Sequence, residues 1–315
     1  MKKGDGLDLQ KLRTYSIRQR PSKVKKEDVV GALSGALTVA ELIDRLPNIL
    51  AGRDLKEVIA SVVSARRSGR PVMVSLGAHV IKVGLSPLLI DLMERGIITG
   101  LALNGAGIIH DFELALVGQT SEDVSAELED GTFGMAEETA VLLNGAVTDG
   151  ARKGIGIGEA VGRLIEGGDF PHRAFSLLAA GVRLAVPVTV HVALGTDIIH
   201  MHPSANGEAI GKGGLIDFHR FTEGVSELEG GVYFNIGSAV LLPEVFLKAL
   251  TIARNLGHTV RNITVVNMDF IQHYRPLTNV VRRPTQRHGK GFNLTGHHEI
   301  MLPLLAAGIL SAMER

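Results

Sequence analysis

The chain has 315 residues, and its 33 Lys and Arg balance 33 Asp and Glu, so the formal net charge is zero. A dedicated nucleic-acid binder normally carries a basic excess, so this balance argues against binding along a phosphate backbone. The absence of cysteine excludes disulfides and Cys-based metal sites, and 45% hydrophobic against 21% charged residues is typical of a globular α/β protein rather than a disordered one.

The first 26 residues are basic and polar and lack the apolar core of a secretory signal. We expect residues 1–30 to form a mobile or partner-docked arm and residues 31–315 to form a single domain. The most apolar stretch, residues 176–195, contains Arg183, Pro187 and His191. It therefore predicts a core helix and a core strand rather than a membrane span, and we expect a cytoplasmic protein without membrane contacts.

Apolar spacing predicts helices over residues 37–50 and 55–67. Short apolar runs that end in glycine or polar turns then predict five strands, within residues 71–77, 98–107, 186–195, 230–239 and 260–269. The stretches between them have helical patterns, over residues 87–96, 108–118, 135–184 and 242–257. Five strands separated by helices indicate an α/β fold, with a mostly parallel, Rossmann-like sheet and helices on both faces.

In such a sheet, ligands bind beyond the carboxyl ends of the strands. Several glycine turns meeting there would suit a nucleotide, whose phosphates need close approach of the backbone, although glycines also simply end strands and begin helices. The residues at the five predicted strand ends are Gly77, Asn104, Gly105, Ala106, Gly107, Thr196, Asp197, Gly237, Ser238 and Asp269.

Two standard nucleotide motifs are absent. Gly105 and Gly107 provide the first two glycines of G-x-G-x-x-G, but position 110 is His. Gly211-Lys212 is preceded by Asn206 where a phosphate-binding loop would have its first glycine. A different reading is a catalytic zinc site, because His200 and His202 share one face of an extended segment and His191 or Asp197 could add a third ligand.

The segment from Asp269 to His298 is rich in basic residues and has the glycine and turn residues of a loop. Partial burial and cationic neighbours lower the pKa of a lysine, and a neutral lysine can form imines. Lys290, which is flanked by Arg and His, is therefore a candidate nucleophile. The alternative is a solvated basic loop that contacts phosphates or a neighbouring subunit.

From about residue 71 to 308 the chain resembles the deoxyhypusine synthases. The resemblance rests on the order of short motifs: SLGAH (75–79), NGAGIIHD (104–111), PVTVHVALGTD (187–197), NIGSAVLLPE (235–244) and RRPTQRHGKG (282–291). It implies an NAD-binding fold without G-x-G-x-x-G and oxidation of spermidine by NAD. It also implies transfer of the aminobutyl group to an enzyme lysine, and a homotetramer whose basic arm packs over a neighbour's site.

By this resemblance Lys290 stands where the imine-forming lysine belongs. Residues at or near cofactor positions are Gly105, Ala106, Gly107, Asp111, Thr196, Asp197, Gly237 and Ser238. The chain departs from the family at Pro243-Glu244, where the family has a histidine pair, and at Thr285-Gln286, where it has an acidic pair.

A polyamine site should present carboxylates, whereas this segment presents arginines, which favour anionic ligands. We therefore expect an NAD-dependent transferase that works through a lysine imine on a substrate other than spermidine. His273 or His288 would carry protons, and Arg282, Arg283, Arg287 and His297 would bind the substrate. A non-catalytic nucleotide-binding or scaffold homologue is the alternative, and a zinc hydrolase is a more distant one.

Overall fold

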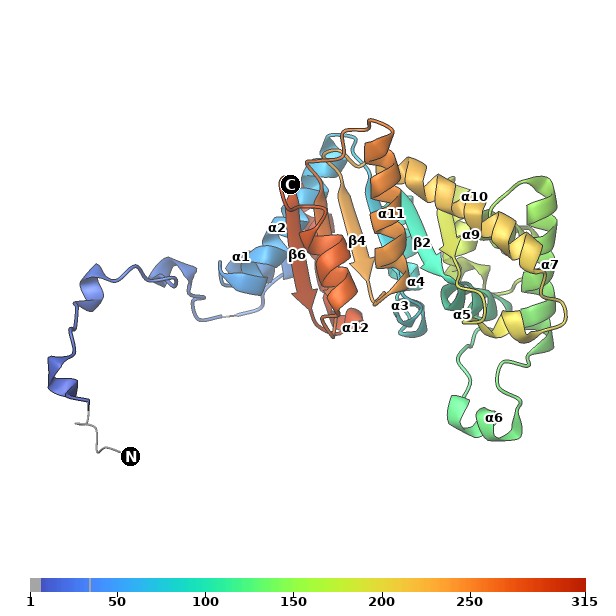
Figure 1. Cartoon of the computed structure of the whole chain (residues 1–315), viewed down its shortest axis with the longest axis horizontal. Coiled ribbons are helices and arrows are strands. Elements are labelled where there is room, and N and C mark those ends of the chain that lie inside the picture. The colour runs from blue at the N-terminus through green and yellow to red at the C-terminus, as the bar shows by residue number, and fades with distance from the viewer. Residues whose placement is uncertain (1–6, 34) are drawn as a thin grey trace, which may run out of the picture.

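The computed structural model describes residues 7–33 and 35–315 and contains a six-stranded sheet in which all strands are parallel (Figure 1). The strand order is β3-β2-β1-β4-β5-β6. This confirms the predicted α/β class, and the predicted mostly parallel sheet is parallel throughout. The strands are β1 (Val72–Leu76), β2 (Gly100–Asn104), β3 (Val188–His191), β4 (Val232–Ile236), β5 (Thr264–Asp269) and β6 (Lys290–Thr295).

β6 corrects the expectation of a loop in the basic C-terminal segment. It pairs with β5 from Lys290 opposite Thr264 to Thr295 opposite Asp269. Only Leu294 is fully buried, because β6 is the last strand of the sheet and has a neighbour on one side only. Such a strand needs no continuous apolar run, so the pattern used to find the five inner strands could not detect it.

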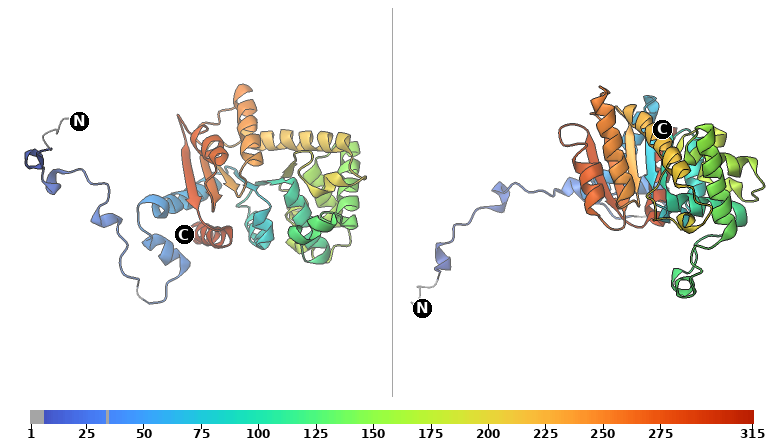
Figure 2. Two further views of the ribbon diagram at one scale, coloured as in Figure 1. Left: turned by 60° about the horizontal axis from the view of Figure 1, so that its bottom comes forward. Right: turned by 45° about the vertical axis from the view of Figure 1, so that its right-hand side comes forward.

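Helices cover both faces of the sheet (Figure 2). α2, α4 and α12 pack over one face, and α10 and α11 cross the other. Residues of β1 alternate between the two faces: Val72 and Val74 belong to the first core and Met73 to the second. The helices are α1 (Val39–Arg45), α2 (Leu50–Arg67), α3 (His79–Lys82), α4 (Ser86–Glu94), α5 (Gly105–Val117), α6 (Val124–Asp130), α7 (Glu137–Lys153), α8 (Ile157–Gly167), α9 (Leu177–Leu184), α10 (Gly207–Ser226), α11 (Leu241–Asn255) and α12 (His298–Glu314).

Two buried carboxylates connect these layers. Asp111 on α5 accepts hydrogen bonds from the hydroxyl of Ser176 and the amide of Leu177, at 2.7 Å, at the start of α9. Asp217 on α10 accepts the amides of Gly158 and Val190, both at 2.9 Å. Burial raises the pKa of Asp111 to about 6 and that of Asp217 to about 7, and the hydrogen bonds offset part of this effect.

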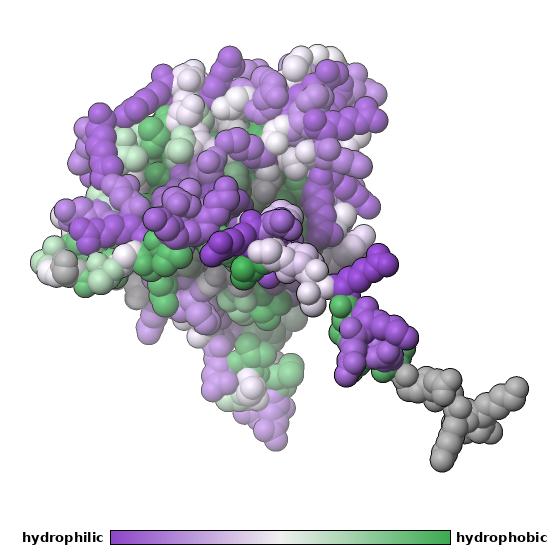
Figure 3. All heavy atoms as spheres, turned by 90° about the vertical axis from the view of Figure 1, so that its left-hand side faces the viewer, coloured by the Kyte–Doolittle hydropathy of each residue, from purple (hydrophilic) through white to green (hydrophobic). Residues whose placement is uncertain are grey.

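The N-terminal segment extends away from the body of the molecule (Figures 1 and 3). Between residues 7 and 33 it forms three short 3-10 turns, Leu9–Lys11, Ile17–Gln19 and Lys26–Asp28, and all of its residues except the partly buried Asp28 are exposed. Residues 1–6 of the predicted arm lie outside the described residues. Throughout the described ranges, no helix combines the length and the apolar character needed to cross a membrane.

Because all strands are parallel, the sheet has two distinct edges. We call the edge at which the strands begin the amino edge and the edge at which they end the carboxyl edge. In Figure 1 the strand arrows point down toward the carboxyl edge. On the face in Figure 3, hydrophilic side chains predominate, and hydrophobic surface is concentrated in its lower part.

Candidate active site at the carboxyl edge

The carboxyl ends of β1 and β4 meet at the centre of the sheet, and we call the position just beyond this meeting point the crevice. The strand order reverses between these two strands, and in open parallel sheets ligands bind at such a reversal. The backbones approach closely there, since the amide of Gly77 donates to the carbonyl of Ile236 at 2.8 Å. A Cβ on Gly77 would lie 2.0 Å from the carbonyl oxygen of Gly237, so only glycine fits. Gly237 has a φ of +68°, which also favours glycine.

His298, the first residue of α12, lies beside this crevice and is fully buried. Its Nε2 is 3.7 Å from Oδ1 of Asp269 at the end of β5, which is too long for a good hydrogen bond. Neither ring nitrogen has a hydrogen-bond partner. An unsatisfied buried polar group costs about 1–3 kcal/mol, so its presence calls for an explanation such as a bound ligand.

The surroundings of His298 keep its imidazole neutral. Burial lowers its pKa, and the carboxylate of Asp269 offsets part of this effect. The rings of His79 and Phe270 lie 6.1 and 6.0 Å from the ring of His298. His297 stacks on Phe270 at 5.9 Å, so aromatic rings surround the buried imidazole. A neutral imidazole of this kind can accept a proton near neutral pH.

The start of α5 forms a second part of the carboxyl edge. The side chain of Asn104 accepts the amide of Gly107 at 3.0 Å and caps the helix. Asp197 packs directly on Gly105, where a Cβ would lie 1.9 Å from its Oδ2. Burial raises the pKa of Asp197, and the nearby His200 is the largest effect that opposes this. The carboxylate therefore lies at the amino end of α5, where the helix dipole favours an anion. Its unpartnered Oδ2 can accept a hydrogen bond from a hydroxyl group.

An amide network supports the ends of the next strands. The Asn235 side chain donates to the carbonyl of Ser238 and to Oδ1 of Asn267, both at 2.9 Å. Asn267 donates to Gln272 at 3.1 Å, and Gln272 donates to Thr295 at 2.8 Å. These bonds connect β4, β5 and β6 and therefore fix the loops around His298.

Most of the predicted cofactor residues lie at this edge, some at the ends of β1, β4 and β5 and the others at the start of α5. Two of them have other positions: Asp111 is buried beneath α9, and Thr196 bonds to the carbonyl of Ala193 in its own exposed loop. His273 is exposed in the loop after β5. The residues at the carboxyl edge are Gly77, Asn104, Gly105, Ala106, Gly107, Asp197, Gly237, Ser238, Asp269 and His297.

Lys290 lies at the amino edge, away from this crevice. It is the first residue of β6, its side chain is 58% exposed, and its Nζ contacts Oε2 of Glu57 on α2 at 2.9 Å. Thr295 at the other end of the strand is five residue steps away, which corresponds to about 16 Å. Arg287 and His288 lie three and two residues before Lys290. Arg282 is the last residue of the π-helix Pro276–Arg282, and Arg283 begins the turn after it. The predicted nucleophile, the proton carrier His288 and the three arginines are therefore not brought to the carboxyl edge.

The histidines of the zinc alternative also have separate partners. His191 Nε2 lies 3.0 Å from the Thr189 hydroxyl, and His202 Nε2 lies 3.3 Å from the carbonyl of Gly134. His200 lies near Asp197, with Nδ1 3.9 Å from Oδ2. Across residues 7–33 and 35–315, no three His, Asp or Glu side chains are grouped so that they could hold a metal ion.

In the sequence, His298 is marked only by its place in the basic segment from Asp269 to His298. A signal that could identify it is the pattern of β2: GFNLTG ends in a polar residue and glycine, as GLALNG does at residues 100–105. Once residues 290–295 are a strand, the next residues must lie at the carboxyl edge.

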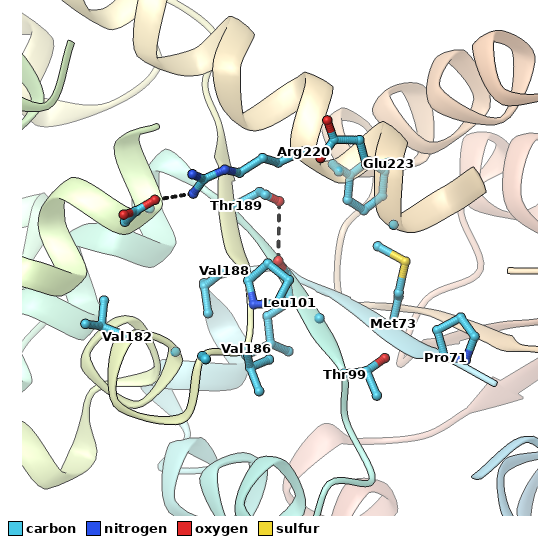
Figure 4. A pocket seen from close by; sticks show the side chains of 18 of the residues that line it. Pro71, Met73, Thr99, Leu101, Val182, Val186, Val188, Thr189, Arg220 and Glu223 are labelled. Atoms are coloured by element: carbon cyan, nitrogen blue, oxygen red, sulfur yellow. Dashed lines mark hydrogen bonds and ion pairs between the residues drawn. The ribbon is translucent and has the colours of Figure 1, made fainter. Parts of the chain in front are cut away.

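A cavity of about 790 Å³ lies at the amino edge between α8, α9 and α10 (Figure 4). Its floor is apolar, with Met73, Leu101 and Val188 among its lining residues. Figure 4 shows Arg220 reaching an acidic partner, which is Glu159, and the same carboxylate also pairs with Arg163. The positive charges at this cavity are therefore neutralised within the protein, and it lacks a buried, unpartnered titratable group of the kind that His298 provides.

No protein-family model and no curated protein matches this sequence. Among solved structures, a conserved LOR/SDH protein from Methanococcus maripaludis S2 is similar over 91% of this chain and 73% of its own, with 13% identity and a TM-score of 0.51. AgrE in ternary complex with ornithine and NAD+ is similar over 86% of this chain, with 14% identity and a TM-score of 0.50. ArgZ, a cyanobacterial arginine dihydrolase, is similar over 82%, with 16% identity and a TM-score of 0.50.

The chain spans only about a third of the AgrE and ArgZ chains, 35% and 31% respectively. At these identities the likeness shows the fold alone. A deoxyhypusine synthase assigned in Entamoeba histolytica has 9% identity and a TM-score of 0.46, too low to support an argument. The predicted fold is confirmed, and the resemblance to known proteins is one of fold.

Proposed function

We propose that this protein binds NAD at the carboxyl edge and oxidises a small alcohol or amine, with His298 as the proton acceptor. The observation that carries the proposal is the fully buried His298, whose two ring nitrogens lack partners beside the Gly77–Gly237 contact. The fold shared with AgrE, a protein solved with ornithine and NAD+, supports the choice of cofactor.

The residues at this edge fit a dinucleotide. The Cβ positions of Gly77 and Gly237 are occupied by the Gly237 carbonyl and the His298 ring, so these two glycines bring the ends of β1 and β4 and the buried imidazole together. The free Oδ2 of Asp197 can accept a ribose hydroxyl, and Asn104 fixes the turn beside it. Bound NAD would supply the acceptor for a hydride.

His298 and Asp269 provide the proton transfer that such an oxidation needs. The neutral imidazole accepts the proton from the substrate's hydroxyl or ammonium group as the carbon is oxidised. The Asp269 carboxylate, held by the amide of Phe270 at 2.8 Å, stabilises the imidazolium that forms. His298 is therefore the catalytic residue and Asp269 the residue that stabilises its charged form.

The lysine-imine mechanism does not fit this geometry. An imine on Lys290 would form at the amino edge, beside Glu57, so we assign the chemistry to His298 instead. Arg282, Arg283 and Arg287 also lie away from the crevice, and they no longer argue for an anionic substrate. We keep the proposal that the substrate is not spermidine, because Asp269, the carboxylate beside His298, is nearly buried and accepts the amide of Phe270.

Calorimetric titration with NAD is the first test, followed by reduction of NAD in the presence of small alcohols, amino acids and amines. We expect binding in the micromolar range, which corresponds to about −8 kcal/mol. The Gly237→Val variant should lose this binding, since its side chain would meet His298, and His298→Gln should keep it but lose turnover. No binding at millimolar NAD would contradict the proposal, and binding without any turnover would instead support a nucleotide-binding protein without catalysis.

A further inference from the structure

A second pocket, of about 380 Å³, lies at the amino edge beside β5 and β6. Its charged side chains come from three segments that meet there: the end of α11, the loop before β5, and the loop before β6. Its polar lining residues are Arg254, Arg261, Arg283, Gln286, Arg287 and His288, and no acidic side chain contributes to the lining.

The four arginines have no carboxylate partner. None of them forms an ion pair with any Asp or Glu of residues 7–33 and 35–315, although the whole chain is neutral. The nearby acid Glu229 already accepts the amides of Arg261 and Asn262, at 2.6 and 3.1 Å. The larger cavity at this edge differs, because its Arg163 and Arg220 share Glu159.

Two of these arginines are held in place by neutral acceptors. Arg254 donates to the carbonyl of Val260, at 3.0 and 2.6 Å, and to that of Pro284 at 3.2 Å. Arg283 donates to Oδ1 of Asn279 at 2.7 Å. Burial, and then the charge of Arg261, lower the pKa of Arg254. The charge of Glu229 acts on Arg254 in the opposite sense and offsets only part of this effect, so the like charges lie close together without an ion-pair partner.

We propose that this pocket binds a small molecule through two adjacent phosphate groups. A guanidinium is a planar fork that pairs with phosphate oxygens through two parallel hydrogen bonds, and several in one concavity match a diphosphate better than a single anion. The volume suits a small ligand rather than a nucleic-acid duplex. The chain's lack of a basic excess also argues against a nucleic acid.

This pocket is separate from the crevice proposed for NAD. β6 lies between them, with His288 just before its first residue and His298 just after the turn that follows its last. The strand alone accounts for about 16 Å, so one ligand diphosphate cannot lie in both places. The two sites can therefore be tested independently.

The test is calorimetric titration with inorganic pyrophosphate at constant ionic strength, using the full chain. The double variant Arg283→Gln/Arg287→Gln removes two of the four charges, and Arg282→Gln is the matched control because Arg282 is exposed and does not line the pocket. We expect the double variant to bind at least about tenfold more weakly and the control to stay within about twofold, since one lost charge-assisted bond corresponds to roughly that factor.

Several results would overturn the proposal: no pyrophosphate binding by the natural chain, equal binding by the double variant, or citrate binding as tightly as pyrophosphate. If thermal unfolding shows that the double variant is not folded, Arg283→Lys/Arg287→Lys keeps the charge without the fork and should still weaken binding. NAD binding should be unchanged in a folded double variant. Its loss would mean that the diphosphate of NAD binds among the arginines, which would overturn both the separate site and the crevice assignment.

Discussion

The two edges of the sheet contain similar residue types in opposite environments. At the carboxyl edge, His298 and Asp269 are buried, and the imidazole has no hydrogen-bond partner. At the amino edge, Lys290 and the arginines around the small pocket are mostly exposed. Burial changes which protonation state a group adopts, whereas exposed charges keep theirs and serve mainly to attract ions of opposite sign. Burial, more than the local sequence, therefore decides which basic side chain can take part in chemistry.

A side chain added at the close contact between β1 and β4 should reduce stability and NAD binding more than any other change considered below. In Gly77→Ala the new Cβ would meet the carbonyl oxygen of Gly237 at 2.0 Å, so the ends of β1 and β4 must separate. We expect a loss of about 3 kcal/mol of stability or more, and loss of NAD binding. Thermal unfolding and NAD titration measure these effects. Gly145→Ala on α7 is the control, because nothing lies within 4 Å of its added Cβ; equal stability of the two variants would refute the close contact.

Next in size is the effect of removing the buried imidazole. His298→Gln should lower NAD-dependent turnover by about a hundredfold, the usual contribution of a general base, and leave the Kd for NAD within about threefold. In the natural chain the rate should rise with pH through a pKa below that of an ordinary histidine, because burial lowers the pKa of His298. His288→Gln at the amino edge is the control. A similar loss in both variants would remove the distinction between the edges.

A third variant tests whether burial by itself shifts the pKa of Asp217, which lies away from both edges. Burial raises the pKa of Asp217 to about 7, so its stabilising contribution is complete below the unfolded value near 3.8 and is lost as the pH rises through about 7. Between pH 5 and 8 the natural chain should lose about 2–3 kcal/mol through this group, and Asp217→Asn should show a correspondingly flatter profile. Denaturant unfolding across this range measures it. The exposed Asp149→Asn should keep the natural slope, and an unchanged slope in Asp217→Asn would contradict the assignment.

The smallest effect is expected at Lys290. Because its ion pair with Glu57 is exposed, Lys290→Ala should cost less than about 1 kcal/mol and leave NAD binding and turnover unchanged. Borohydride in the presence of an amine substrate should not attach the substrate to this lysine. Trapping on Lys290, or a tenfold loss of turnover, would restore the imine mechanism and make the amino edge the reactive one.

The inner sheet could be predicted from the sequence because β1, β2, β3, β4 and β5 are apolar and end in glycine or polar turns. That pattern also located Gly77, Asn104, Gly105, Gly237 and Asp269 at one edge. The edge strand β6 has one buried residue, so the apolar pattern predicts a loop where the structure has a strand. Without a strand there, nothing separates Lys290 from His298, although they lie at opposite ends of it.

The pattern of apolar residues in the sequence also could not predict which individual polar side chains are buried. His297 and His298 are adjacent in the chain, yet one is exposed and the other completely buried, because α12 begins between them. The basic residues from 282 to 290 have no feature in the sequence that assigns them to the amino edge, since this depends on the register of β6 against β5.

The position of the crevice has a consequence for how the chain folds. Val72 of β1 pairs with Val232 of β4, 160 residues later, whereas β1, β2 and β3 are joined by the chain between them. Pairing across so long a separation is slow, so the β1–β4 seam is expected to close late, after each half of the sheet has formed. A ligand held by Gly77 on one side and Gly237 on the other would tie the two halves together and slow their separation during unfolding.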